Sequence, residues 1–478
     1  MINHLLDLPD HVLSLIMAAH LGSGGGRDPD LGGLDVACKD TRRLFLERIS
    51  TVKWSKDARC CQNDDLVFVA EKCKNATSVK ISGCRALKVA DIVGHLSALT
   101  ALQALDASNT RISDIGPLSA LTGLRALDVN WTRVVDVGPL TALTGMKALD
   151  VSFTKVADIG PLSTLTGLQT LDASNTCISD VGPLSALTGL LDIDVSWTGI
   201  ADVRHLTSLI GVKTLNVRST LITDIGHLSA LTGLQTLIMG CCMQIVDFGP
   251  LSVLTGLRTL NVGSTKVTEV GPFTTLTGLQ DLDVSGCMGI TSVGQLSALT
   301  GLRRLEMSYN TRVADVGPLS VLTGLQTLNM RSCGINDVNP LSALTGLRRL
   351  DVSYNTRVTD VNPLSALTGL RRLDVSYNTR VTDIGPLSAL TGLQTLNMRS
   401  CGITDVNPLS ALIGLQMLNV GMTNVTDVGP LSALTGLHTL DMMRTKITDI
   451  GHLTALTCLR KLHLGGCVGI ANIVANLP

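Results

Sequence analysis

The amino-acid sequence predicts an α/β solenoid in which short coils stack around a concave parallel sheet. The chain of 478 residues is too long for one compact core, and only 2 % of its residues are aromatic. Leu, Thr, Val and Asp instead recur in fixed phrases such as LTGL. Such self-similarity indicates an array of coils that contact only their neighbours, rather than several globular domains.

The repeat is aligned on the last apolar residue of each LTGL-type phrase, which we number position 0. Successive residues at this position are separated by 22 or 23 residues along the chain. They are Leu102, Leu124, Met146, Leu168, Leu190, Val212, Leu234, Leu257, Leu279, Leu302, Leu325, Leu347, Leu370, Leu393, Leu415, Leu437 and Leu459. A divergent earlier copy begins near Ala76, which makes about eighteen units in residues 76–478.

The positions within one unit predict a strand, a tight turn and a short helical segment. Apolar residues at 0, +3 and +5, as in Leu124, Leu127 and Val129, predict a short strand with one buried face, because side chains alternate along a strand. The Asp before Gly-Pro, as in Asp114 and Asp158, is expected to accept a hydrogen bond from the next free backbone N–H. The Pro that follows favours the start of a helical turn.

These residues resemble leucine-rich repeats, in the short form whose convex side carries little regular helix. The resemblance covers about 400 residues. It implies a horseshoe with a parallel concave sheet, and it implies that position +8 ties each turn to the neighbouring coil. That position holds Cys84, Cys242, Cys287, Cys333, Cys401 and Cys467, or Asn310, Asn355 and Asn378, and Thr in most units of 22 residues. Each type can donate a hydrogen bond to a buried carbonyl, so we interpret these cysteines as structural and expect no metal site.

The concave face is predicted to carry a charged and aromatic binding surface. Position +4 holds an unbroken row of aspartates in the N-terminal half, and position +7 holds six of the eleven aromatic residues. Arginines join the tyrosines further along the chain. The residues predicted to bind a protein partner are Asp106, Asp128, Trp131, Asp150, Phe153, Asp172, Asp194, Trp197, Arg304, Tyr309, Arg349, Tyr354, Arg372 and Tyr377.

The acidic row favours a basic or cationic partner segment on the N-terminal half. Like charges on adjacent strands repel, so fold stability alone is not expected to explain the row. Exposed aromatic side chains are typical anchors of protein interfaces. Two other interpretations stay open. The aromatic residues could stack at a strand end without binding anything, and recent duplication could have copied residues irrespective of use, since GLQTLNMRSCGI occurs at Gly324 and again at Gly392.

The first 50 residues differ from the repeats and predict two amphipathic helices. LPDHVLSLI, followed by LDVACKDTRRLFLERI, resembles the F-box, a family that binds the Skp1-type linker of cullin–RING ubiquitin ligases. The resemblance implies that the linker-binding residues are Leu8, Pro9, Val12, Leu13, Ile16, Leu34 and Cys38. His11, Met17 and Thr41 depart from the F-box pattern. The alternative is that both helices only cover the open end of the solenoid. Residues 51–75 are expected to form a linker or N-terminal cap.

The sequence predicts a protein that works by binding, without catalysis and without cofactors. It contains neither an HExxH nor a GxSxG motif, and its net charge of −1 gives no general attraction to nucleic acid or anionic membranes. Thirteen cysteines without a secretory signal favour the cytoplasm or nucleus. Our leading hypothesis is a substrate-receptor adaptor of a Skp1–cullin–F-box ubiquitin ligase, with a protein substrate on the concave face. The alternative is a free-standing recognition scaffold, or a binder comparable to phosphatase regulators.

Overall fold

The computed structural model describes residues 51–53, 73–85 and 95–467. Their contacts divide the chain into two units, residues 1–221 and residues 222–478, and each unit is described by itself. The predicted F-box-like residues (Leu8, Pro9, Val12, Leu13, Ile16, Leu34 and Cys38) lie outside the described residues. The predicted domain boundaries at residues 50 and 75 therefore stay predictions.

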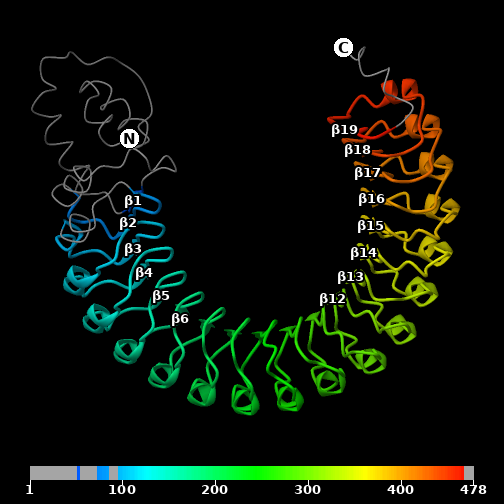
Figure 1. Ribbon diagram of the computed structural model, residues 1–478. Coiled ribbons are helices and arrows are strands. Elements are labelled where there is room, and N and C mark those ends of the chain that lie inside the picture. The colour runs from blue at the N-terminus through cyan, green and yellow to red at the C-terminus, as the bar shows by residue number, and fades with distance from the viewer. Residues whose placement is uncertain (1–50, 54–72, 86–94, 468–478) are drawn as a thin grey trace, which may run out of the picture. The chain divides into compact units, whose positions relative to one another are not determined.

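The first unit is a stack of short parallel strands joined by 3-10 helices. Its strands are β1 (Thr51–Lys53), β2 (Ser78–Lys80), β3 (Ala104–Asp106), β4 (Ala126–Asp128), β5 (Ala148–Asp150), β6 (Thr170–Asp172), β7 (Asp192–Asp194) and β8 (Thr214–Asn216). Its helices are η2 (Gly116–Ala120), η3 (Gly138–Ala142), η4 (Gly160–Thr164), η5 (Gly182–Ala186) and η6 (Arg204–Ser208). Strands line the inner side of this stack and helices line the outer side (Figure 1).

The second unit repeats the arrangement. Its strands are β9 (Thr236–Ile238), β10 (Thr259–Asn261), β11 (Asp281–Asp283), β12 (Arg304–Glu306), β13 (Thr327–Asn329), β14 (Arg349–Asp351), β15 (Arg372–Asp374), β16 (Thr395–Asn397), β17 (Met417–Asn419), β18 (Thr439–Asp441) and β19 (Lys461–His463). Its helices are η7 (Gly226–Ala230), η8 (Gly249–Val253), η9 (Gly271–Phe273), η10 (Gly294–Ala298), η11 (Gly317–Val321), η12 (Asn339–Ala343), η13 (Asn362–Ala366), η14 (Gly385–Ala389), η15 (Asn407–Ala411), η16 (Gly429–Ala433) and η17 (Gly451–Ala455).

Every strand pairs in parallel with its sequence neighbour within the unit, and the repeat positions stay in register. Leu105 lies opposite Leu127, and Leu127 lies opposite Leu149. The residues at 0, +3 and +5 are almost fully buried between coils, as predicted, except in the last unit, where Leu459, Leu462 and Leu464 are partly exposed. Each buried Leu contributes roughly 1.5–3 kcal/mol to stability. Stacked apolar layers therefore hold the solenoid together, and the predicted parallel-sheet solenoid is confirmed.

The turn before each 3-10 helix has the predicted cap. The Asp114 carboxylate accepts a hydrogen bond from the Gly116 N–H at 2.7 Å, and Asp158 accepts one from Gly160 at 2.7 Å. A Pro occupies the first or second position of most of these helices, where its missing N–H costs nothing. The short 3-10 segments agree with the predicted lack of regular helix on the convex side.

Side chains at position +8 make two different hydrogen bonds, depending on their type. The Thr154 hydroxyl donates to the Val151 carbonyl of its own coil at 2.6 Å. The Cys333 thiol donates instead to the carbonyl of Met307 in the preceding coil at 2.9 Å. Asn side chains also reach the preceding coil, as in the bonds from Asn310 to Val284, Asn355 to Met330 and Asn378 to Val352. The predicted link between coils therefore holds for Cys and Asn. Thr bonds a carbonyl of its own coil, and Thr265 and Thr445 also lie within hydrogen-bond distance of the Cys in the following coil.

Strand β1 was not predicted. It pairs in parallel with β2, so that Val52 lies opposite Val79, and Val52 is buried. The sequence TVK is too short to show an alternating pattern, so no repeat signal precedes Ala76. The sheet of the first unit consequently begins before the first recognisable repeat.

Candidate functional site

The candidate binding surfaces are the strand faces, formed by the side chains at positions +2, +4, +6 and +7. We define the first-unit surface as Asp106, Asp128, Asp150, Asp172 and Asp194 together with Trp131, Phe153 and Trp197. We define the second-unit surface as Arg304, Arg331, Arg349, Arg372 and Arg399 together with Tyr309, Tyr354 and Tyr377. Strand pairing aligns the members of each row on neighbouring strands. The row spacing is therefore the strand spacing, ~4.8 Å.

The aspartate row has a structural role that sequence reasoning did not anticipate. The Asp128 carboxylate accepts the backbone N–H of Asn130 at 3.0 Å, and Asp150 accepts the N–H of Ser152 at 2.9 Å. Asn216 makes the same bond with the N–H of Arg218 at 3.0 Å. An oxygen acceptor at +4 therefore closes the strand end. Asn216 supplies the same acceptor for a backbone N–H, so this bond by itself does not require a negative charge.

The first-unit carboxylates are not neutralised by neighbouring cations. Within the described residues, none of the five aspartates forms an ion pair. Burial, reinforced by the carboxylates of Asp150 and Asp106, raises the pKa of Asp128 to about 6. Burial likewise raises the pKa of Asp172, with a contribution from Asp150 and Asp194. The first-unit surface is thus a site of unfavourable negative charge that a cationic ligand would relieve.

Position +7 is a left-handed backbone position throughout the array. The backbone angle φ is 53° at Trp131, 53° at Phe153 and 58° at Trp197. Bulky residues seldom adopt this conformation, whereas Gly and Asn adopt it readily. Asn109 and Asn175 occupy the same position in neighbouring units, which is the sequence signal that could have revealed the conformation. The aromatic residues are therefore held where the backbone disfavours them.

The first-unit aromatic residues are exposed and only partly brought together. The rings of Trp131 and Phe153 stack with centroids 4.3 Å apart and planes inclined by 11°. Trp131 is 58 % exposed and Trp197 is 57 % exposed. Trp197 lies two strands beyond Phe153, and Asn175 occupies the intervening unit. The unit thus presents one stacked pair and one separate tryptophan.

On the second-unit surface, arginine and tyrosine side chains form an ordered ladder. The rings of Tyr354 and Tyr377 stack at 4.1 Å with an angle of 18°. The Arg331 guanidinium lies 4.0 Å from the Tyr354 ring centroid, and its Nε donates to the Tyr309 hydroxyl at 3.1 Å. The Nε of Arg399 donates to the Tyr377 hydroxyl at 3.2 Å. Stacking and cation–π contact therefore fix these side chains across five strands, β12 to β16.

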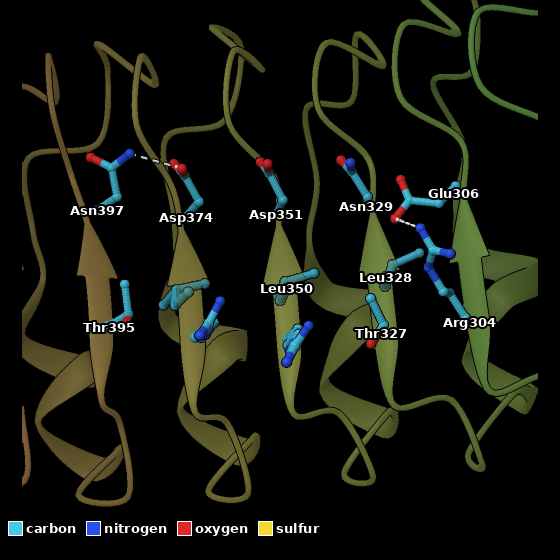
Figure 2. A pocket seen from close by; sticks show the side chains of 13 residues that line it. Arg304, Glu306, Thr327, Leu328, Asn329, Leu350, Asp351, Asp374, Thr395 and Asn397 are labelled. Carbon is cyan, nitrogen blue, oxygen red and sulfur yellow. Dashed lines mark hydrogen bonds and ion pairs between the residues drawn. The ribbon is translucent and has the colours of Figure 1, made fainter. Parts of the chain in front are cut away.

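Next to this ladder lies an open hollow of about 590 Å³ (Figure 2). It is lined by Arg304, Glu306, Thr327, Leu328, Asn329, Arg349, Leu350, Asp351, Arg372, Leu373, Asp374, Thr395 and Asn397. Arg304 forms ion pairs with Glu306 at 3.1 Å and with Asp281 at 3.4 Å. The hollow thus brings together the three predicted +2 arginines.

The part of the chain that the structure describes contains no group of three or more His, Cys, Asp or Glu side chains placed to hold a metal ion. It also contains no helix long and apolar enough to cross a membrane. Burial raises the pKa of the Cys333 and Cys401 thiols to about 12, so these side chains remain protonated hydrogen-bond donors.

Comparison with known proteins identifies the repeat. Residues 323–366 and residues 368–411 each match the family described as leucine rich repeats (2 copies). No match was found among curated proteins. The chain therefore carries leucine-rich repeats, as its residue pattern suggested.

Three bacterial proteins are among the solved structures that resemble this chain. An internalin (InlF) from Listeria monocytogenes is 26 % identical with a TM-score of 0.59, over 70 % of this chain and 89 % of the internalin. The functional domain of InlJ from the same organism, which includes a cysteine ladder, is 21 % identical with a TM-score of 0.56, over 76 % of this chain and 73 % of that domain. A leucine-rich-repeat protein of Leptospira interrogans is 16 % identical with a TM-score of 0.62, over 86 % of this chain and 99 % of that protein.

Proposed function

We propose that this protein is a non-catalytic recognition scaffold that binds a protein partner along its strand faces. The observation that carries the proposal is the placement of large aromatic side chains at exposed, left-handed backbone positions. Trp131 and Trp197 occupy such positions, whereas Asn109 and Asn175 show that the fold accepts a better suited residue there. Packing does not compensate at Trp197, and at Trp131 the stack with Phe153 still leaves more than half of the residue exposed.

Interface energetics support this interpretation. Exposed Trp and Tyr anchors dominate binding energy when a partner desolvates them, and strained residues concentrate at functional sites. The uncompensated aspartates around Trp131 add charge that the strand-end bond does not need, since Asn216 makes the same bond. Structural likeness to repeat proteins such as the internalin fits a binding role. We extend the proposal to a reducing compartment, cytoplasm or nucleus, in which the thirteen cysteines stay as thiols.

Quantitative affinity purification with two matched variants tests the proposal. Trp131→Asn/Trp197→Asn places at both positions the residue that the neighbouring units carry. Ile210→Thr serves as the control because Ile210 is an exposed apolar residue at a repeat position that holds Thr in every other unit except that of Ile413. We expect partner proteins captured by the wild type to fall at least about tenfold with the tryptophan variant and to persist with the control. Equal capture by all three proteins would contradict a recognition role for the first-unit surface.

A second candidate function is the ubiquitin-ligase adaptor. It rests on the F-box-like stretch LPDHVLSLI, whose residues lie outside the described part of the chain. In this proposal Leu8, Pro9 and Leu13 contact a Skp1-type linker while the strand faces hold the substrate. The measurement is capture of a purified linker by the wild type and by Leu8→Ala/Pro9→Ala/Leu13→Ala. Capture by the wild type alone would support the adaptor, and no capture by the wild type would exclude it.

A further inference from the structure

Two arginines in the second-unit hollow lack partners of their own. Arg349 on β14 and Arg372 on β15 lie directly opposite each other in the parallel register, and both side chains are exposed. Within the described residues neither guanidinium takes part in an ion pair or side-chain hydrogen bond. Arg304, at the equivalent position of β12, is instead held by Glu306 and Asp281.

The nearest carboxylates on the same strands are engaged at the strand ends. Asp351 accepts the backbone N–H of Ser353 at 2.8 Å. Asp374 accepts the N–H of Ser376 at 2.9 Å, and its other oxygen accepts the Asn397 amide at 2.8 Å, a bond drawn in Figure 2. These bonds engage both carboxylates at or beyond position +4. The guanidiniums at position +2 are thereby left with unused donors.

The fold does not require arginine at this position. Thr occupies position +2 in β6, β8, β9, β10, β13, β16 and β18. Like charges placed directly opposite on adjacent strands destabilise a sheet. Thr327 and Thr395, on the strands that flank the pair, add hydroxyl groups to the same row. A line of hydrogen-bond donors with a positive centre therefore crosses four strands, β13 to β16.

We infer that Arg349 and Arg372 form a subsite for an acidic side chain of a protein partner, with the Tyr354–Tyr377 stack as the adjoining platform. Strands ~4.8 Å apart allow two guanidiniums to converge on one carboxylate, an interaction for which the planar fork of Arg is suited. The inference rests on the proposed recognition function and names the chemistry of the ligand at one site.

The hollow selects for a protein carboxylate over a polyanion. Glu306, Asp351 and Asp374 line the same hollow, and they would repel the closely spaced phosphates of a nucleic acid. A protein segment can instead place one acidic side chain over the arginine pair and amide or hydroxyl donors over the carboxylate row. The stacked tyrosines at the far end of β14 and β15 then offer a flat apolar contact for the next part of that segment.

Selection from a phage-displayed library of random peptides, carried out on the full chain, tests the inference. Arg349→Thr/Arg372→Thr introduces the commonest residue of position +2. The matched control is Arg348→Gln/Arg371→Gln, which removes the same charge one residue earlier, where neighbouring units carry Gln326 and Gln394. Circular dichroism verifies that both variants fold like the wild type.

We expect the wild type and the control to enrich peptides that share an acidic residue, and the threonine variant to lose them. For the most enriched peptide, replacing its acidic residue by the corresponding amide should weaken binding to the wild type at least about tenfold. The same replacement should leave binding to the threonine variant unchanged. Enriched peptides that bind the threonine variant as tightly as the wild type would overturn the inference while leaving the recognition function intact. A wild type that enriches no peptide at all would count against both.

Discussion

The two units build opposite surfaces from one repeat. In the first, five aspartates on consecutive strands lack ion-pair partners among the described residues, beside exposed tryptophans. In the second, arginines alternate with tyrosines, and several guanidiniums are fixed by tyrosine hydroxyls or carboxylates. The backbone bond that closes each strand end is the same in both units and needs only an oxygen at +4. The fold therefore does not determine the charge and the aromatic content of the strand face, and both are available for recognition.

The units also differ in how position +8 connects the coils. In the first unit Thr side chains bond carbonyls of their own turns, as in Thr132 and Thr154. In the second unit Cys and Asn side chains cross to the preceding coil. At position +8, Cys333 and Asn355 of the second unit therefore make hydrogen bonds between coils that Thr132 and Thr154 of the first unit do not make. Four predictions test these differences.

The largest expected difference is in thiol reactivity. A pKa of about 12 reduces the thiolate fraction of Cys333 and Cys401 by about a thousandfold, and burial further hinders access. Cys177 and Cys458 are exposed. We expect iodoacetamide to modify the exposed thiols of the native protein at mildly alkaline pH, and to modify the buried ones only after denaturation. Peptide mass spectrometry measures this, and comparable native labelling of Cys333 would contradict its role as a buried donor.

The next largest effect concerns stability at position +8. The Asn355 oxygen accepts the N–H groups of Cys333 at 3.0 Å and Gly334 at 2.9 Å, while its amide donates to the Met330 carbonyl at 2.9 Å. Asn355→Ala leaves these buried groups without partners and should lower the free energy of unfolding by about 3–4 kcal/mol. Thr154→Ala removes one bond within a coil and should cost about 1 kcal/mol. Urea unfolding of both variants, with hydrogen exchange to locate the opening, provides the test. Equal losses would show that links between coils add nothing.

Much of this architecture could be predicted because it depends on residue type alone. The burial of Leu127 and Val129 follows from alternation along a strand, and the Asp114 bond follows from the chemistry of Asp before a free N–H. The strain at Trp131 could not be inferred from its own unit, because left-handed conformation is a property of the backbone. Asn109 in the neighbouring unit and Gly286 in the second unit occupy the same position and carry that information.

The candidate site was predictable as rows of residues, although their interactions were not. Parallel register follows from the constant repeat length, so neighbours such as Tyr354 and Tyr377 could be placed together. Which arginine finds a partner depends on side-chain length and on residues of adjacent strands. Glu306 reaches Arg304, whereas the shorter Asp351 is turned to the backbone of Ser353. Three-dimensional packing determines which arginine forms an ion pair, and the repeat pattern of the sequence does not show it.

A smaller effect concerns the charge of the first-unit surface. Burial raises the pKa of Asp128 to about 6, so the folded chain holds this proton more tightly than the unfolded chain does. The wild type should therefore lose stability as pH rises from about 4 to about 6, and the loss should persist at higher pH. Asp128→Asn keeps the bond to Asn130 without the charge. At about pH 7 we expect it to be more stable than the wild type by about 1 kcal/mol, allowing for solvent screening.

The pH profile of denaturant midpoints measures this effect. The advantage of Asp128→Asn should disappear below about pH 3, since the wild-type carboxyl is then protonated in both states. Asp136→Asn is the exposed comparison, because Asp136 makes the same type of bond to the N–H of Gly138. An advantage of Asp128→Asn that stays constant with pH would show that charge is not its cause.

At position +7, the sign of the effect depends on whether the aromatic residue has neighbours. Trp197→Asn replaces an exposed ring at φ 58° by a residue that accepts this conformation, and should raise stability by up to about 1 kcal/mol. Trp131→Asn also loses the stack with Phe153, so its net change should be close to zero. Tyr377→Asn loses a stack and the bond from Arg399, and should lower stability by about 1–2 kcal/mol.

Denaturant unfolding of the three variants, combined with partner capture, distinguishes recognition from inheritance by duplication. If Trp197 is present only because its unit was copied by duplication, its replacement should not affect binding. Trp197→Asn would then be more stable than the wild type and would bind the partner equally well. A ring kept for recognition would give a variant that is more stable and binds less. The second unit cannot provide this separation, because its tyrosines are tied into the ladder with Arg331 and Arg399 and would lose stability and binding together. Trp197 is therefore the position at which the loss of stability caused by an aromatic side chain can be measured separately from its contribution to partner binding.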